Sequence, residues 1–155
     1  MATTYLIDSN ILVYAYDLDS HYHKKAKEII DKKVLSGKIN ACVSHQVLYE
    51  FYAVITDSRR VGSPLESDKA REIIESCQKA VNLKKIFPLS NTLKTVINLL
   101  KKYSVSKQSV FDLVLVATMM DNNIKGIYTT NEAHFKQFEF LEVINPLKAT
   151  KSRRK

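Results

Sequence analysis

The run YLIDSNILVYAY at residues 5–16 carries the clearest structural signal in this chain of 155 residues. Its first three residues, Tyr5 to Ile7, are apolar without alternation, which is typical of a short strand buried on both faces of a parallel sheet. Asp8 follows directly, and residues 10–16 predict a short helix. A carboxylate therefore stands where a buried strand passes into a helix.

The same succession of strand and helix repeats along the chain. Apolar runs predict further strands at residues 41–43, 85–87, 126–129 and 141–144. Apolar residues at helical spacing predict helices at residues 22–34, 47–55, 65–77, 93–100 and 110–120. Ser44 and Pro64 predict the starts of the second and third of these. Strands separated by helices indicate an α/β domain with a parallel sheet.

Length and composition favour one globular domain. Hydrophobic residues make up 45% and charged residues 26%, as in ordinary globular proteins. No apolar run approaches the roughly 20 residues that span a bilayer, and residues 5–16 lack the features of a signal peptide. Cys42 and Cys77 both lie in apolar patterns, which favours buried, reduced thiols in a cytoplasmic protein, although a disulfide is an alternative.

The net charge of +8 is concentrated at the C-terminus. Residues 148–155 hold five cations and no acid, so the rest of the chain carries only +3. We therefore divide the chain into a folded domain, residues 1–147, and a basic tail, residues 148–155, which we expect to be disordered. Such a tail can contact phosphate groups or simply increase solubility.

Asp8 and Glu50 are the first candidates for a functional site. Ligands of open parallel sheets bind outside the carboxyl ends of the strands, where Asp8 stands. The alternative is that Asp8 only caps the following helix. Glu50 falls about 60° from Val47 around its helix, at the border of the apolar stripe. A carboxylate there is half-buried, which is costly without a partner, although it can also reach solvent.

Asp112 opens a helix that is otherwise almost wholly apolar. Its spacing from Ser109 also fits a capping box, in which Asp112 would bond back to the Ser109 backbone. Asp121 lies nine residues further on, about 13.5 Å along the axis and half a turn around it. One site cannot use both acids, so we expect Asp121 to be solvated and outside the site.

Three carboxylates in one place would require a counter-charge. At about 4 Å each pair repels by roughly 4 kcal/mol at an effective dielectric constant near 20. A divalent cation removes this repulsion, and oxygen ligands suit Mg²⁺ or Mn²⁺. Hydrolysis of a phosphodiester is the reaction class that follows. Spacing alone does not show that these acids converge.

Five motifs occur in order, and together they resemble the PIN-domain nucleases, most closely the VapC-type ribonuclease toxins of toxin–antitoxin pairs. The resemblance covers about residues 4–145. The motifs are YLIDSNILVYAY at residues 5–16, LYEF at 48–51, RRVGSPL at 59–65, FDLVLVAT at 111–118 and YTTNEAHF at 128–135.

The resemblance implies a five-stranded parallel sheet flanked by helices, with the site at its carboxyl edge. It implies that Asp8, Glu50 and Asp112 hold one Mg²⁺ or Mn²⁺ ion firmly. Asn10 would position a ligand or water. Asn131 stands where the family often has another acid, and it can orient water but adds no charge. Glu132 is a lesser candidate for that place.

The resemblance also implies an endoribonuclease that cuts RNA, forms a homodimer and is inhibited by a cognate antitoxin protein. Alternatives are a stand-alone RNA-processing nuclease and a non-catalytic scaffold that binds RNA or protein. A haloacid-dehalogenase-type phosphohydrolase is disfavoured, because Asn10 occupies the place of its second Asp. We expect His134 to pack locally with Phe135. Tyr14 and Tyr16 either line an RNA groove or pack in the core.

Overall fold

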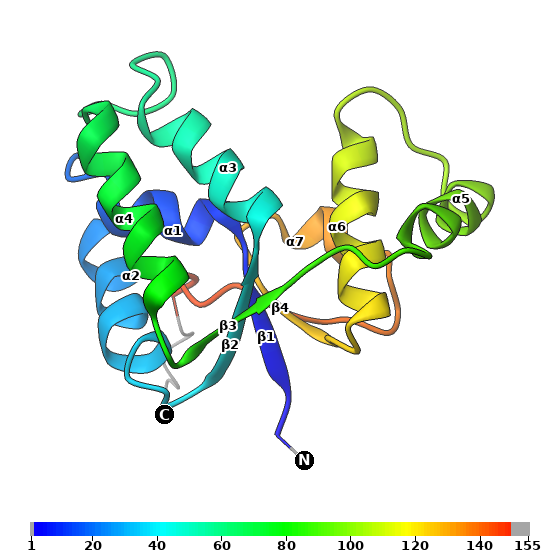
Figure 1. Ribbon diagram of the computed structural model, residues 1–155. Helices are drawn as coiled ribbons and strands as arrows, with labels where there is room; N and C mark the ends of the chain where they lie inside the picture. Colours follow the sequence, from blue (N-terminus) through cyan, green and yellow to red (C-terminus); the bar gives the residue numbers. More distant parts are fainter. Residues whose placement is uncertain (1, 150–155) are drawn as a thin grey trace, which may run out of the picture.

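The computed structural model describes residues 2–149. Five strands form one parallel sheet in the order β3-β2-β1-β4-β5 (Figure 1). The strands are β1 Thr4–Ile7, β2 Asn40–Ser44, β3 Leu83–Ile86, β4 Gly126–Tyr128 and β5 Glu142–Ile144. The predicted α/β fold with a five-stranded parallel sheet is therefore confirmed. Of the predicted tail, residues 150–155 lie outside the described residues.

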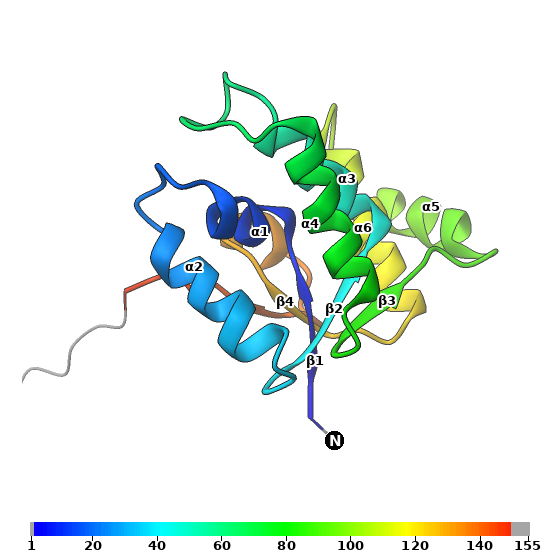
Figure 2. The same ribbon diagram turned by 60° about the vertical axis from the view of Figure 1, so that its left-hand side comes forward.

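Helices cover both faces of the sheet (Figures 1 and 2). One side carries α1 Ser9–Tyr16, α2 His23–Ile29, α3 His45–Ile55 and α4 Ser67–Lys79. The other side carries α5 Thr92–Lys102 and α6 Ser109–Asp121. The short helix α7 Glu132–Phe135 lies between β4 and β5 in the sequence. No helix in residues 2–149 combines the length and apolar character needed to cross a membrane.

Two helices differ from their predicted form. The helix predicted at residues 22–34 ends in a π-helical turn, η1 Ile30–Val34, and the Leu35 amide bonds to the Ile30 carbonyl at 2.8 Å. Helix α4 begins at Ser67 rather than beside Pro64. The Leu65 amide donates to the Ile55 carbonyl at 2.9 Å, which ties the chain before α4 to the end of α3.

The core lies between the sheet and its two helical layers. Leu6 and Ile7 of β1 are fully buried, and so is Phe51 of α3. Helix α6 is buried on most sides, as predicted, because Leu113, Val116, Ala117 and Met119 have no exposed surface. Each fully buried side chain of the size of Leu or Ile contributes roughly 1.5–3 kcal/mol. These contacts fix the helices that carry the candidate site.

The two cysteines are free and buried, in agreement with the predicted reduced thiols. Burial raises the pKa of the Cys42 thiol to about 12. It also raises the pKa of Cys77. Since the thiolate is the reactive form, both cysteines serve the core rather than chemistry.

The order of the strands places a crevice beside β1. The chain passes from β1 to β2 on one side and later returns to β4 on the other, so the strand order reverses between β1 and β4. Ligands of doubly wound sheets bind at such a switch point. The Asp8 amide donates to the Tyr128 carbonyl at 3.0 Å, which brings the residues that follow β1 and β4 side by side.

Candidate metal centre

Asp8 occupies the switch point and is almost completely buried, with 5% of its surface exposed. It is the N-cap of α1, and its Oδ1 accepts a hydrogen bond from the Ser9 amide at 2.8 Å. Its Oδ2 accepts hydrogen bonds from the Thr129 hydroxyl at 2.7 Å and from the side-chain amide of Asn10 at 3.2 Å. Asp8 is therefore the predicted helix cap, and its carboxylate also lies at the switch point, where it remains a candidate site residue.

Burial raises the pKa of Asp8 from its ordinary value of 3.8 to about 6. Hydrogen bonds from Thr129 and Ser9 oppose this shift, because they stabilise the ionised form. The negative charges of Glu50 and Asp112 add to it. The charges of the other two predicted acids thus reach Asp8, and no cation among the described residues forms an ion pair with Asp8.

Thr129 is a site residue that sequence reasoning missed. It is fully buried, and besides its bond to Asp8 its Oγ1 accepts from the Asn131 amide at 3.0 Å. Asn10 donates to the same Oγ1 at 3.3 Å, and the Asn10 Oδ1 accepts from the Thr130 amide at 3.1 Å. These bonds tie the start of α1 to the loop after β4. Both polar groups of Asn10 therefore contact protein, and they help to orient Asp8.

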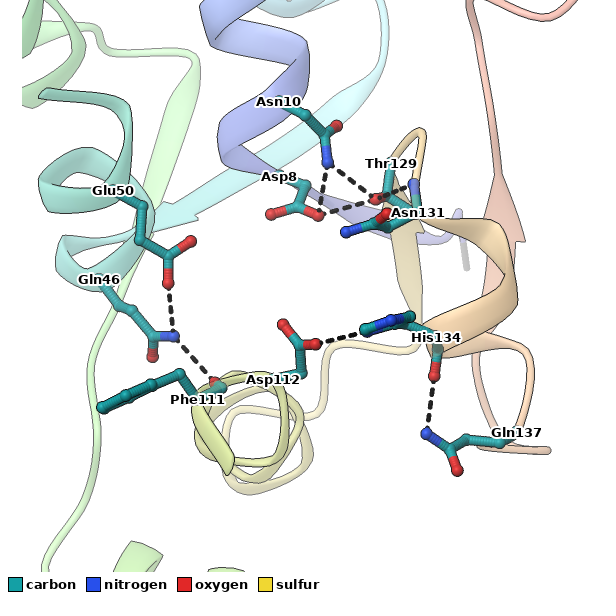
Figure 3. Close-up of polar contacts among 10 residues, drawn as sticks. All are labelled: Asp8, Asn10, Gln46, Glu50, Phe111, Asp112, Thr129, Asn131, His134 and Gln137. Carbon is teal, nitrogen blue, oxygen red and sulfur yellow. Dashed lines mark hydrogen bonds and ion pairs between the residues drawn. The ribbon is translucent and has the colours of Figure 1, made fainter. Parts of the chain in front are cut away.

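Glu50 lies half-buried on α3 and faces Asp8 (Figure 3). Its Oε2 accepts from the Ser9 hydroxyl at 3.3 Å. Its Oε1 accepts from the side-chain amide of Gln46, one turn earlier, at 3.0 Å. That amide also donates to the Phe111 carbonyl at 2.9 Å, so Gln46 connects α3 to the start of α6. This link holds Glu50 and the helix that carries Asp112 at a fixed spacing.

Asp112 does not form the capping box that its spacing allowed. The N-cap position of α6 is Gln108, and no side chain caps this helix end. Instead, the Asp112 Oδ2 lies 2.7 Å from the Nδ1 of His134 on α7 (Figure 3). The prediction that His134 packs with Phe135 is wrong: Phe135 is buried, whereas His134 is exposed and bonds to Asp112. With Asp112 ionised, Nδ1 must carry the proton of this bond.

The two remaining candidates, Asn131 and Glu132, differ in where their side chains lie. Asn131 is exposed, and Figure 3 shows it on the rim of the space beside Asp8. Glu132 points away to ion pairs with Lys136 and Lys148, each at 3.5 Å. Burial raises the pKa of Glu132, but these two ammonium groups outweigh that effect and lower it overall.

Asp121 lies at the opposite end of α6 from Asp112, outside the site, as predicted. It is not simply solvated, however. Its carboxylate accepts hydrogen bonds from the hydroxyls of Thr92 at 2.7 Å and Thr95 at 2.9 Å, both on α5. Asp121 therefore joins α5 to α6, which is a structural role.

The carboxylates of Asp8, Glu50 and Asp112 face one open space, which we call the acidic hollow (Figure 3). Within residues 2–149 no three His, Cys, Asp or Glu side chains are arranged so that they could hold a metal ion by themselves. Mg²⁺ commonly binds through one or two carboxylates and keeps several waters, so it does not need such a cage. The oxygen-only donors and the buried carboxylate of Asp8 therefore fit a hydrated Mg²⁺ or Mn²⁺ ion.

The raised pKa of Asp8 predicts a pH-dependent stability of the metal-free protein. Between pH 4 and about 6 the folded state binds more protons than the unfolded chain, so the free energy of unfolding falls as pH rises. Ionisation of Asp8 lowers the free energy of unfolding by about 3 kcal/mol in total, and the full loss is reached above pH 6. Urea unfolding in EDTA measures it: the wild type should lose stability relative to Asp8→Asn across this range. Parallel pH profiles of the two proteins would contradict the buried, ionised carboxylate.

The two aromatic candidates, Tyr14 and Tyr16, pack against different neighbours. Tyr16 packs edge-on against Phe51 at 5.9 Å between ring centres, and Lys27 Nζ lies 4.6 Å from the Tyr16 ring centre. Of the two predicted alternatives, core packing applies to Tyr16. Tyr14 is also half-buried against the core, and its ring contacts that of Tyr22 at 5.3 Å between ring centres.

Known proteins resemble this chain over most of its length. The family model described as "PIN domain" matches residues 5–141, which include all the predicted site residues. Ribonuclease VapC24 of Mycobacterium tuberculosis is 27% identical over 143 residues, which is 91% of this chain and 95% of that protein.

Several solved structures share the fold, including the following two. One is Mycobacterium tuberculosis VapC20, described as a sarcin–ricin loop cleaving toxin, with a TM-score of 0.64 and 13% identity over 88% of this chain and 95% of that chain. The other is a toxin–antitoxin complex from Klebsiella pneumoniae, with a TM-score of 0.58 and 15% identity over 92% and 97%. Since the family model spans most of the sequence, this chain belongs to the PIN-domain family.

Proposed function

We propose that this protein is a divalent-metal-dependent endoribonuclease and the toxin of a toxin–antitoxin pair. The acidic hollow carries the proposal, because three carboxylates from separate elements face one space at the β1–β4 switch point. Membership of the PIN-domain family supports it, as does the similarity to a protein named Ribonuclease VapC24. The substrate is RNA, and the reaction is hydrolysis of a phosphodiester bond.

In this proposal Asp8, Glu50 and Asp112 would hold a hydrated cation between them. When bound, a divalent cation supplies a Lewis acid for the phosphate oxygens and lowers the pKa of water. Thr129 and Asn10 hold the Asp8 carboxylate in place, and Gln46 holds Glu50. Asn131 on the rim orients water or a phosphate oxygen. The ion is Mg²⁺, with Mn²⁺ as a substitute, because oxygen donors suit both.

The reduced thiols support a proposed cellular location, and the family supports the proposed protein partners. A cytoplasmic location suits the two free, buried cysteines. We propose a homodimer, and a cognate antitoxin as the protein partner. The likeness to a toxin–antitoxin complex from Klebsiella pneumoniae supports such a partner.

A metal-restoration assay tests the proposed activity. Purified protein treated with EDTA should not cut single-stranded RNA, and added Mg²⁺ or Mn²⁺ should restore internal cleavage. RNA binding without cleavage under every metal condition would contradict the nuclease. That outcome would favour the non-catalytic scaffold, which the neutral Asn131 also favours because it removes one acid from the site.

Substitution of His134 should reveal a positioning role. Phe removes the Nδ1–H group that contacts Asp112, whereas Asn places an amide donor close to the same position. We expect His134→Phe to raise the Mg²⁺ concentration for half-maximal cleavage by about 10- to 100-fold, the usual cost of losing an outer-shell partner. His134→Asn should recover most of this loss.

Metal titrations at saturating RNA measure the effect of His134 separately from RNA affinity. A structural role alone would lower the melting temperature of His134→Phe without changing the metal requirement. Equal metal requirements in the wild type and both variants would contradict the positioning role.

A further inference from the structure

A second hollow lies beside the acidic hollow. It is bordered by Tyr14, Tyr22 and Lys25 on the α1–α2 side and by Thr130 and Lys148 on the other. We propose that this space, the tyrosine–lysine hollow, binds a nucleotide of single-stranded RNA next to the scissile phosphate. The inference rests on the proposed ribonuclease function and names where its substrate lies.

A third hollow lies between the tyrosine–lysine hollow and the residues that contact Asp8. Tyr14 lines the tyrosine–lysine hollow and also a neighbouring hollow that contains Asn10 and Asn131. Thr130 lines the tyrosine–lysine hollow, and its backbone amide donates to the Asn10 Oδ1 at 3.1 Å. Asn10, which bonds to Asp8, and Tyr14 thus place the tyrosine–lysine hollow next to the proposed metal site.

Tyr22 presents an aromatic surface in a fixed orientation. The residue is 41% exposed, although large aromatic residues are usually more buried. Tyr14 contacts it edge-on at 5.3 Å and His21 at 5.2 Å between ring centres. The neighbouring rings hold Tyr22 in place and leave part of it in solvent. An exposed, immobilised ring is a platform on which a base can stack.

The charge of this hollow is positive. The Lys25 ammonium donates to the Lys148 carbonyl at 3.4 Å, and no ion pair within residues 2–149 involves Lys25. Lys148 shares Glu132, the only acid among the described lining residues, with Lys136.

The opposite side of the acidic hollow lacks these features. The space bordered by Asp112 and His134 has serines and a glutamine around it, and none of its described lining residues is Lys or Arg. Phosphate groups bind ammonium groups, and unpaired bases stack on aromatic rings. Single-stranded RNA offers both groups in every nucleotide, so the tyrosine–lysine hollow is the side on which it binds.

Binding of a labelled single-stranded RNA in EDTA, where the strand stays intact, tests this subsite. Tyr22→Leu should weaken binding about tenfold, the usual effect of losing one stacked base, whereas Tyr22→Phe should bind like the wild type. Lys25→Gln should lower the slope of log affinity against log salt by about 0.7. Phe140→Leu and Lys125→Gln are matched controls, because this aromatic–lysine pair borders a hollow at the far end of α6.

Wild-type RNA affinity and salt dependence in both Tyr22→Leu and Lys25→Gln would overturn the subsite. Loss of binding to a partner protein with unchanged RNA binding would overturn it too, since the hollow would then be a protein interface. Cleavage by the wild type with Mg²⁺ is measured separately. A wild type that binds RNA through Tyr22 and Lys25 but never cuts it would refute the nuclease and support the subsite.

Discussion

Replacing Asp8 with Asn is expected to remove RNA cleavage and, at the same time, to stabilise the metal-free protein. Asn keeps the N-cap oxygen and the shape of the side chain but removes the charge and replaces Oδ2, the acceptor of Thr129 and Asn10, with an NH2 group. Without that charge, stabilisation of the reacting phosphate should fall, and cleavage should drop by at least about 10²–10³-fold. Because burial raises the pKa of Asp8 to about 6, the ionised group destabilises the fold at pH 7. Removal of this charge should raise the free energy of unfolding by up to about 3 kcal/mol.

The initial rate of RNA cleavage and the melting temperature in EDTA measure the two effects. A gain of this size corresponds to several degrees in a domain of this length. Asp8→Ala is the control, since it removes both the charge and the cap, and the lost cap costs about 0.5–2 kcal/mol. An Asp8→Asn protein that still cuts RNA, or that melts well below the wild type, would contradict this assignment.

Asp112→Asn should cause a loss of cleavage of similar size, whereas Asp121→Asn should leave cleavage nearly unchanged. Both acids lie on α6, and both substitutions remove one negative charge. A difference in activity between the two variants therefore reports where the charge lies on the helix. In Asp112→Asn the new amide oxygen can still accept the hydrogen bond from His134, and the geometry of α7 should persist while one negative charge is lost from the acidic hollow. The Asp121 carboxylate bonds instead to Thr92 and Thr95 at the far end of the helix.

Cleavage rates of the two variants at equal Mg²⁺ concentration make this comparison, and their melting temperatures report folding. Asp121→Asn can lower stability through its threonine contacts, but its activity per folded molecule should match the wild type. Equal rates for Asp112→Asn and the wild type would remove Asp112 from the site. Equal losses in both variants would show that any charge change on α6 has the same effect.

Local patterns predicted most of the fold. The uninterrupted apolar run before Asp8 indicated a strand buried on both faces, and β1 is the central strand of the sheet. Ser44 as a helix cap was also predicted, and its Oγ accepts from the Val47 amide at 3.3 Å. Such features depend on neighbours a few residues away. The start of α4 was misplaced, since it depends on a bond between Leu65 and the distant Ile55.

The site could be predicted only in part for the same reason. Asp8 and Asp112 stand at the boundaries of strongly apolar elements, which a sequence displays. Thr129, Gln46 and His134 act through partners more than twenty residues away or on a different element, and no spacing rule links them. A useful signal for Thr129 was its place after β4, where a parallel neighbour of β1 must bring it beside Asp8.

The central claim is that Asp8, Glu50 and Asp112 together form one divalent-metal site. Mn²⁺ titration followed by electron paramagnetic resonance of the free ion tests it most directly, in the wild type and in Asp8→Asn, Glu50→Gln, Asp112→Asn and Asp121→Asn. We predict one firmly bound Mn²⁺ ion per wild-type chain, weaker binding in each of the first three variants, and wild-type binding in Asp121→Asn. Unchanged Mn²⁺ binding in Asp8→Asn, Glu50→Gln and Asp112→Asn would contradict the account.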